Sequence, residues 1–403
     1  MTIKNLNLKD LGLKLFFAFI CICPVFFDPY KSAGLRLHQE QFFQLGAVIL
    51  FAVVFLESIH LALFLFWSIF IYAYYGFPPI GGAYVMNIFF GCLLYQVAYK
   101  LIDRDNLRSF YRAILWLCVL NIVWMIFQKL NIDPIFMNKG EYSKDLVGLF
   151  GLKAFMGMFL ALSIPFVARL NIWLPLAFFV PIYLSDCSVA VVAGAASYLF
   201  ALFFDYKKMF WSFLIVLLVG GCFYVAKDTK NGMFTDRFSV WLVSTRDAFK
   251  HPIVGWGLDS FRNMGEVKPF IYMKNVRTNE SRAVSIKEIQ VYKESGVFPP
   301  MGDFIKDNDT LNPWDHPHNE YVSLLYEFGL IGVLIFVCLC VDLFKGFYPN
   351  DDLIALMGFF IGVLIISTGQ FPFHVARIGY LIPIVLGIYK KLTDENEREI
   401  YGT

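Results

Sequence analysis

A short histidine-containing run lies where a long polar stretch meets an apolar one, and its residue types suit proton transfer. The run reads Asp315-His316-Pro317-His318-Asn319-Glu320-Tyr321. Asn319 is a preferred helix N-cap, and a carboxylate such as Glu320 is favoured in the first turn of a helix. An imidazole held at this helix start could act as a general base near neutral pH, and the same helix end could bind a phosphate. A purely structural helix cap would account for the same residues.

The apolar run that follows carries a row of polar residues. Glu320, Ser323 and Glu327 have the spacing i, i+3 and i+7, so on a helix they would form a stripe leading inward from the histidine run. If this helix spans a membrane, a charged side chain within it is costly and by default suggests a function. Alternatively, Glu327 is a packed, paired carboxylate. The pattern Gly329-x-x-Gly332 could simply permit close helix packing.

A second group of candidate residues lies earlier in the polar stretch. Residues 236–250 have apolar residues at helical spacing, which predicts an amphipathic helix that ends at His251-Pro252. Arg237 and Trp241 would share one face of this helix. Arginine keeps its charge and offers a planar fork of donors that suits bidentate phosphate binding. The other arginines of the stretch are more simply interpreted as surface residues: Arg246, Arg262, Arg277 and Arg282.

Carboxylates and imidazoles crowd around the histidine run, which raises a metal-binding alternative. The residues concerned are Asp307, Asp309, Asp315, His316, His318 and Glu320. Sets of this kind can bind zinc or manganese. Their spacing matches no closed zinc pattern, so we favour the interpretation without a metal.

Composition indicates the environment in which these residues act. The chain has 403 residues, of which 58% are hydrophobic and 16% charged, and its mean hydropathy is +0.60. Soluble domains carry roughly 25% charged residues, so the composition indicates an integral membrane protein and excludes soluble enzymes. A net charge of +2 gives no basic field for nucleic acid. All eight cysteines fall in apolar stretches, which indicates buried thiols and no disulfide framework.

Hydropathy predicts an all-α integral membrane fold with about twelve transmembrane helices, within a range of about eleven to thirteen. The predicted spans are 13–27, 42–57, 59–75, 83–99, 110–128, 147–168, 170–184, 188–204, 210–226, 321–341, 353–368 and 375–389. The first span follows Lys4, Lys9 and Lys14 in the manner of a signal peptide. Because no small-residue cleavage site follows it, we interpret it as a retained helix.

The distribution of Lys and Arg among the short loops predicts that both termini lie in the cytoplasm. In this topology residues 1–226 form the first nine spans, and residues 321–403 form the last three spans and a cytoplasmic tail. Residues 227–320 form one large loop on the outer side. A loop of this length is rarely a mere connector, and it contains no low-complexity run. We therefore expect it to fold, mostly as helix, and to carry the functional site.

The motifs together resemble a known family. The pair His318-Asn319, nine residues and then Gly329-x-x-Gly332, preceded by Arg237-x-x-x-Trp241 and by His251-Pro252 with Gly255-x-Gly257, is similar to the O-antigen ligase and polymerase superfamily. The similarity covers about residues 140 to 340. It implies a fold like that of GT-C membrane glycosyltransferases. It also implies an enzyme of the bacterial inner membrane that takes a glycan from an undecaprenyl-diphosphate carrier at the periplasmic face, without nucleotide sugar, metal or other cofactor.

The family's functional residues can be carried over one by one. Its essential histidine falls on His318, and its motif arginine falls on Arg237. The family often has further arginines in an Arg-Gly-Thr-Phe-like stretch and in a Ser-Arg pair, where this chain instead has a stretch ending at Lys153 and the pair Ser185-Asp186. Lys153 is the candidate substitute for the second arginine, and Asn319 is a further candidate ligand of the diphosphate. The candidate supporting residues are Glu327, His316 and Trp241.

The resemblance leaves several functions open, of which we favour an O-antigen ligase that uses lipid A-core as its acceptor. The alternatives are a polysaccharide polymerase, whose acceptor is itself carrier-linked, and a protein O-oligosaccharyltransferase. A polysaccharide or lipid transporter would need several basic residues inside its spans, whereas Lys153 and Arg377 are the candidates here. Sugar faces could stack on Trp256, Tyr272 and Trp314, although Trp256 could equally belong to the core of the loop.

Overall fold

The computed structural model describes most of the helical part of the chain and portions of the polar loop. The described residues are 59–75, 79–130, 132, 148–150, 152–205, 241–242, 244–258, 260–263, 270–274, 281–285, 317–345, 347–370, 372–374 and 376–402. They fall into two compact units. The first unit takes in the described parts of Met1–Ala62, Met86–Phe213 and Cys340–Thr403, and the second those of Leu63–Val85 and Leu214–Leu339.

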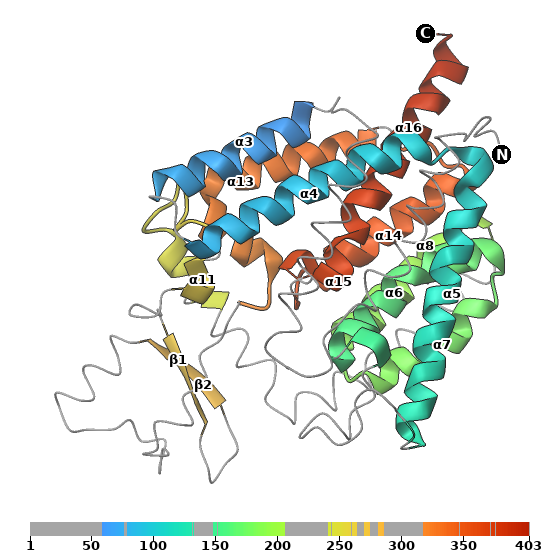
Figure 1. Cartoon of the computed structure of the whole chain (residues 1–403), viewed down its shortest axis with the longest axis horizontal. Helices are drawn as coiled ribbons and strands as arrows, with labels where there is room; N and C mark the ends of the chain where they lie inside the picture. Colours follow the sequence, from blue (N-terminus) through green and yellow to red (C-terminus); the bar gives the residue numbers. More distant parts are fainter. Residues whose placement is uncertain are drawn as a thin grey trace, which may run out of the picture. The chain divides into compact units, whose positions relative to one another are not determined.

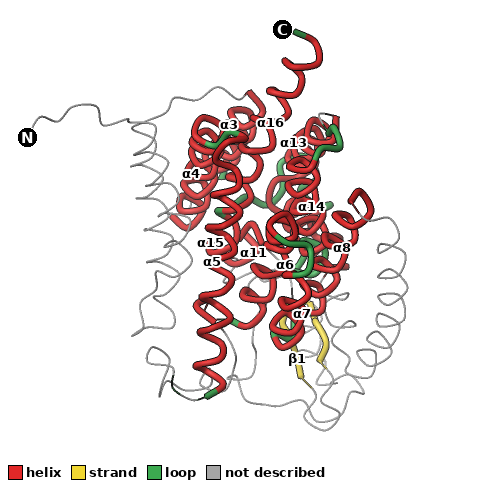
Figure 2. The backbone as a smooth tube through the Cα atoms, turned by 90° about the vertical axis from the view of Figure 1, so that its right-hand side faces the viewer, coloured by secondary structure: helices red, strands yellow, loops and turns green. Residues whose placement is uncertain are grey.

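The first unit is a helical bundle built around α6 (Lys153–Leu170), an apolar helix with most of its side chains buried. Helix α6 packs against α5 (Arg104–Lys129), α7 (Leu174–Leu184), α8 (Ser188–Asp205) and α14 (Asp351–Ile366). Figures 1 and 2 both show α6 beside α7, α8 and α14. The unit is completed by most of α4 (Pro79–Leu101), by α16 (Leu381–Tyr401), and by the short elements η2 (Gly148–Phe150), η4 (Pro372–His374) and α15 (Ala376–Gly379).

Small residues allow the bundle helices to approach closely. A Cβ on Gly194 of α8 would lie 2.9 Å from Cδ1 of Ile164, and one on Gly358 of α14 would lie 3.1 Å from Cβ of Pro165. Ser197 of α8 donates a hydrogen bond to the carbonyl oxygen of Gly358 at 2.8 Å. Small residues and interhelical hydrogen bonds of this kind are typical of helix packing in a membrane, where burial of apolar surface offers little driving force.

Three described helical segments are long and apolar enough to cross a membrane: Arg104–Lys129, Lys153–Leu170 and Glu320–Asp342. Leu174–Leu184 and Ser188–Phe204 are shorter apolar helices. These segments support the predicted all-α membrane architecture. Each predicted span that falls on described residues, except the last, corresponds to a helix whose bounds are shifted by a few residues. Spans 13–27, 42–57 and 210–226 lie outside the described residues, and the total of about twelve spans stays a prediction.

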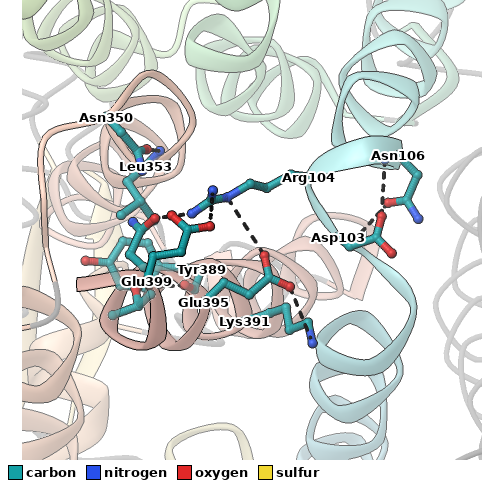
Figure 3. A network of polar contacts seen from close by, with 11 residues as sticks. Asp103, Arg104, Asn106, Asn350, Leu353, Tyr389, Lys391, Glu395 and Glu399 are labelled. Atoms are coloured by element: carbon teal, nitrogen blue, oxygen red, sulfur yellow. Dashed lines mark hydrogen bonds and ion pairs between the residues drawn. The ribbon is translucent and has the colours of Figure 1, made fainter. Parts of the chain in front are cut away.

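The last helix differs from its prediction, because the sequence suggested a span over 375–389 followed by a tail. Helix α16 instead begins at Leu381 and continues through the polar residues to Tyr401. Its polar half finds partners at the start of α5, as Figure 3 shows. Arg104 forms ion pairs with Glu399 at 2.7 Å and with Glu395 at 3.9 Å, and it also donates to Asn396. These contacts explain why the helix persists beyond its apolar part.

The second unit contains α3 (Ile59–Tyr74) from Leu63 onward, the start of α4, α11 (Ser260–Asn263) and α13 (Glu320–Lys345) up to Leu339. It also contains a hairpin of β1 (Phe270–Lys274) and β2 (Ser281–Ser285), in which Phe270 lies opposite Ser285 in an antiparallel register. The sequence predicted a mostly helical loop, and this hairpin was not expected. Helix α13 carries the candidate site, and it is interrupted at Gly329.

Candidate active site

His318 lies immediately before α13 in an unusual backbone conformation. Its φ angle is +52°, in the left-handed region that residues with a Cβ seldom adopt. This conformation costs about 1–2 kcal/mol, so its neighbours must hold it. On one side, the indole Nε1 of Trp241 donates to the carbonyl oxygen of Pro317 at 2.8 Å. On the other side, Asn319 caps the helix. His318 is therefore fixed between two anchored residues.

The predicted cap at Asn319 is confirmed. Its side-chain oxygen accepts hydrogen bonds from the backbone nitrogens of Tyr321 at 3.0 Å and Val322 at 3.1 Å. The backbone nitrogen of Ser323 donates to the carbonyl oxygen of Asn319 at 2.9 Å. These bonds satisfy amide groups that the first turn of a helix otherwise leaves without partners. The structural role of Asn319 is thus established, and its part in diphosphate binding stays a prediction.

A polar row runs along the buried face of α13, as the i, i+3, i+7 spacing predicted. The exposed fractions are 6% for Glu320, 1% for Ser323 and 0% for Glu327, whereas His318 is half-buried. Two carboxylates therefore lie within the protein, near the start of a helix whose remainder is strongly apolar. Burial of a carboxylate is costly unless its surroundings compensate for the charge.

Helix α13 is broken at Gly329, whose backbone angles are φ +65° and ψ −168°. A break in a membrane helix leaves backbone groups that must find other partners within the protein. Here the loop 252–257 and the indole of Trp67 supply them. The bonds run from Trp256 N to Tyr326 O at 2.7 Å, Gly257 N to Glu327 O at 3.2 Å, Leu330 N to Pro252 O at 2.8 Å, Ile331 N to Ile253 O at 3.4 Å, and Trp67 Nε1 to Phe328 O at 3.4 Å.

The glycines of the two motifs meet at this break. Gly255 and Gly257 have φ angles of +71° and +98°. A Cβ on Gly257 would lie 2.9 Å from the ring of Tyr75, whose hydroxyl donates to the carbonyl oxygen of Gly255. Gly329 thus serves the contact between a broken helix and a loop, and not the helix–helix packing that the sequence also allowed. Tyr75 and Trp67 take part in this contact, and no sequence signal had identified them.

Trp256 belongs to the core of the loop, one of the two roles that the sequence left open. Its Nε1 donates to the carbonyl oxygen of Asp247 at 2.9 Å. Its ring lies 4.1 Å from the ring of His251 and 6.2 Å from that of Tyr326, measured between centroids. Phe261 packs against the same tyrosine at 5.3 Å. Sugar stacking stays a prediction for Tyr272 and Trp314.

Lys153 is the first residue of α6 and belongs to the first unit. Its Nζ forms an ion pair with Oδ2 of Asp186 at 2.9 Å, and both side chains are exposed to solvent. The turn before α6 is held by two amide side chains of α5. Asn121 accepts from the backbone nitrogen of Leu149 at 3.0 Å, and Gln128 bonds both backbone groups of Gly148. Asn121 and Gln128 were not among the predicted site residues, although polar amides within an apolar span were a usable signal.

Two candidates cannot be placed. Arg237 and His316 lie outside the described residues, as do the side chain of Tyr272 and the whole of Trp314. Within the part of the chain that the structure describes, no three His, Cys, Asp or Glu residues form a group that could hold a metal ion. The metal-binding alternative rests on other residues that lie outside that part: Asp307, Asp309, Asp315 and His316.

Comparison with known proteins gives one finding on the family. Residues 154–337 match the model of a family described as O-antigen ligase. A search of curated proteins found no match. The matched segment begins at the second residue of α6, directly after Lys153, and ends within α13. It therefore contains His318, both loop glycines and the helix break.

Proposed function

We propose a function from the premise that the chain belongs, through residues 154–337, to the O-antigen ligase and polymerase superfamily. The proposed function is transfer of a glycan from an undecaprenyl-diphosphate carrier to an acceptor hydroxyl. The proposed enzyme is a multi-pass protein of the bacterial inner membrane, and its site faces the periplasm. Its preferred acceptor is lipid A-core, which makes it an O-antigen ligase. It works without a metal ion and inverts the configuration of the anomeric carbon.

The proposed reaction is a direct displacement with His318 as general base. The imidazole takes the proton of the acceptor hydroxyl, and the acceptor oxygen attacks the anomeric carbon. The bond from that carbon to the diphosphate oxygen breaks, and the carrier diphosphate leaves with the electron pair. A positioned base of this type contributes about 10² to 10⁴ in rate.

The departing diphosphate needs cationic partners. Arg237 is proposed as the main one, because its guanidinium can donate two parallel hydrogen bonds. Lys153 and Asn319 are proposed as further ligands. His316, Glu327 and Trp241 are proposed to support the site. Stabilisation of the charge that develops on the leaving group is the largest contribution expected from such a site.

One observation carries this proposal: the half-buried His318 is held in a left-handed conformation at the head of a buried polar helix face. A simple helix cap does not require the residue before Asn319 to adopt a costly conformation. Backbone strain of this kind clusters at active sites and ligand clamps. Its location within the family segment supports a role in the reaction.

Reconstituted transfer tests the proposal. The purified protein in liposomes would receive an undecaprenyl-diphosphate glycan together with either lipid A-core or a second carrier-linked glycan. Transfer to lipid A-core, with the opposite anomeric configuration in the product by NMR, supports the ligase. Chain extension on the carrier alone would make the protein a polymerase. Absence of transfer to either acceptor would contradict the proposed donor.

A further inference from the structure

One segment of the polar loop contacts the first half of α13 at both ends. We call residues 241–257 the docked segment; residue 243 within it is not described. At its start, Trp241 donates to the carbonyl oxygen of Pro317, directly before His318. At its end, the backbone nitrogens of Trp256 and Gly257 donate to carbonyl oxygens next to the break at Gly329. The docked segment therefore reaches from the residues just before α13 to the break at Gly329.

The docked segment also has internal contacts, which join its end to its middle. Trp256 Nε1 donates to the carbonyl oxygen of Asp247, which lies in the helical turn that follows Trp241. The side chains of Lys250 and Asp247 form an ion pair within the same turn. Ala248 packs in a buried cluster with Tyr326 of α13. Figure 1 shows this part of the chain in yellow.

Trp241 is thus part of a segment that is held against α13 through its later residues. The indole of Trp241 donates one hydrogen bond to the carbonyl oxygen of Pro317, the residue before His318. This bond connects the docked segment to the backbone at the histidine. A left-handed residue has few backbone alternatives, and release of the Pro317 carbonyl would allow the peptide to turn away. The imidazole of His318 would then lose the direction that its backbone conformation sets.

We propose that Trp241 is a positioning residue for His318: its indole N–H fixes the Pro317 carbonyl and thereby the direction of the imidazole. This inference rests on the proposed function, in which His318 is the base. Trp241 does not touch the reacting atoms. Its contribution should therefore appear in the rate of the chemical step and not in the affinity for the carrier glycan.

Trp241→Phe tests the proposal, because it removes the N–H donor and keeps an aromatic ring. The matched control is Trp67→Phe, which removes an indole donor to Phe328 O, a carbonyl of the same helix ten residues beyond His318. We expect Trp241→Phe to lower kcat about tenfold, the scale of one hydrogen bond, with KM unchanged. Trp67→Phe should stay within about twofold of wild type, because its bond is long and distant from the histidine.

A double variant separates positioning from a general structural role. In the background of His318→Gln, the additional change Trp241→Phe should have no further effect on the residual rate, because the two residues act as one unit. An additive loss, an effect on KM alone, or equal losses in Trp241→Phe and Trp67→Phe would overturn the proposal. A Trp241→Phe protein that fails to fold would also contradict it, since a positioning residue should be dispensable for the fold.

The same variants distinguish failure of this inference from failure of the proposed function. Full activity of His318→Gln would show that His318 is not the base, and the proposed mechanism would be wrong. An inactive His318→Gln combined with wild-type kinetics for Trp241→Phe would remove the inference alone.

Discussion

Gly255 and Gly329 lie so close together that neither has room for a side chain. A Cβ on Gly255 would lie 2.5 Å from the carbonyl carbon of Glu327, and a Cβ on Gly329 would lie 2.6 Å from the backbone nitrogen of Gly255. Because both residues also have positive φ angles, the contact requires glycine on both sides. The loop thus replaces the hydrogen bonds that the break in α13 removes.

Gly329→Ala should separate the docked segment from α13. The new methyl group meets the carbonyl oxygen of Ile253, and alanine disfavours the left-handed conformation. We expect a loss of about 2 kcal/mol in stability, measured as a lower midpoint of thermal unfolding in detergent, together with a loss of transfer. The control is Gly91→Ala, since a Cβ there would lie 3.8 Å from Pro383 and meets no obstacle. Equal stability of the two variants would refute the requirement for glycine at position 329.

His318→Ala should abolish glycan transfer while expression and membrane insertion stay normal. Loss of the base is expected to lower the rate by about 10² to 10⁴. His316→Ala should be milder, because only His318 has the family spacing. Transfer from purified carrier glycan, measured on both variants in the same lipid, checks the pair. Near wild-type transfer by His318→Ala would rule out His318 as the base. The histidine run would then have only its structural role as a helix cap.

The predicted topology can be tested with two single cysteines in a cysteine-free background. Asn275→Cys lies in the large loop, which we expect outside the membrane, and Lys207→Cys lies in a loop that we expect in the cytoplasm. In intact spheroplasts, an impermeant thiol reagent should label position 275 and not position 207. The opposite pattern would invert the topology and remove the periplasmic site.

Lys153 can be tested apart from its ion pair with Asp186. If Lys153 binds the diphosphate, Lys153→Met should raise KM for the carrier glycan about tenfold, because a charge-assisted hydrogen bond is lost. Asp186→Asn should leave KM unchanged or lower it. It should alter stability by less than about 1 kcal/mol, since the pair is exposed. Asparagine also tolerates the left-handed conformation of residue 186, where φ is +51°. An unchanged KM in Lys153→Met would assign the lysine to the ion pair alone.

The sequence predicted the features of the site that depend on local residue types. The Asn319 cap and the buried stripe through Glu327 follow from spacing along one helix, and both are present. The break in α13 was not predicted, because it depends on a pairing with a loop some seventy residues earlier. Gly329 has the same spacing to Gly332 whether it serves a break or helix packing. Only the position of the loop decides between these roles.

The end of a helix can also depend on contacts with distant segments, which local sequence does not predict. The polar half of α16 has no apolar stripe that would predict burial, and it is stabilised by Arg104 of α5, which is distant in sequence. The ion pair of Lys153 with Asp186 likewise joins the start of α6 to the turn before α8, two segments that are separate in the sequence. Contacts between distant segments are what hydropathy and local motifs leave out.

Arg237→Lys is the sharpest test of how the carrier diphosphate is held. Lysine keeps the charge but loses the planar fork, so a bidentate contact with the diphosphate should be badly impaired. We expect transfer to fall about tenfold to a hundredfold, the scale of one or two charge-assisted hydrogen bonds. A structural arginine paired with a carboxylate would tolerate the same change better. The control is Arg246→Lys, at an exposed position of the docked segment, which should retain wild-type activity.

The assay uses purified polyprenyl-diphosphate glycan and acceptor, with and without EDTA, for wild type and both lysine variants. If Arg237 neutralises the leaving diphosphate, chelation should leave the wild-type rate unchanged, because no metal ion shares that charge. Full activity of Arg237→Lys would eliminate the bidentate contact. Loss of wild-type activity on chelation, restored by one divalent ion, would instead assign the charge to a metal bound near the histidine run and would make Asp307, Asp309 and Asp315 its first candidate ligands.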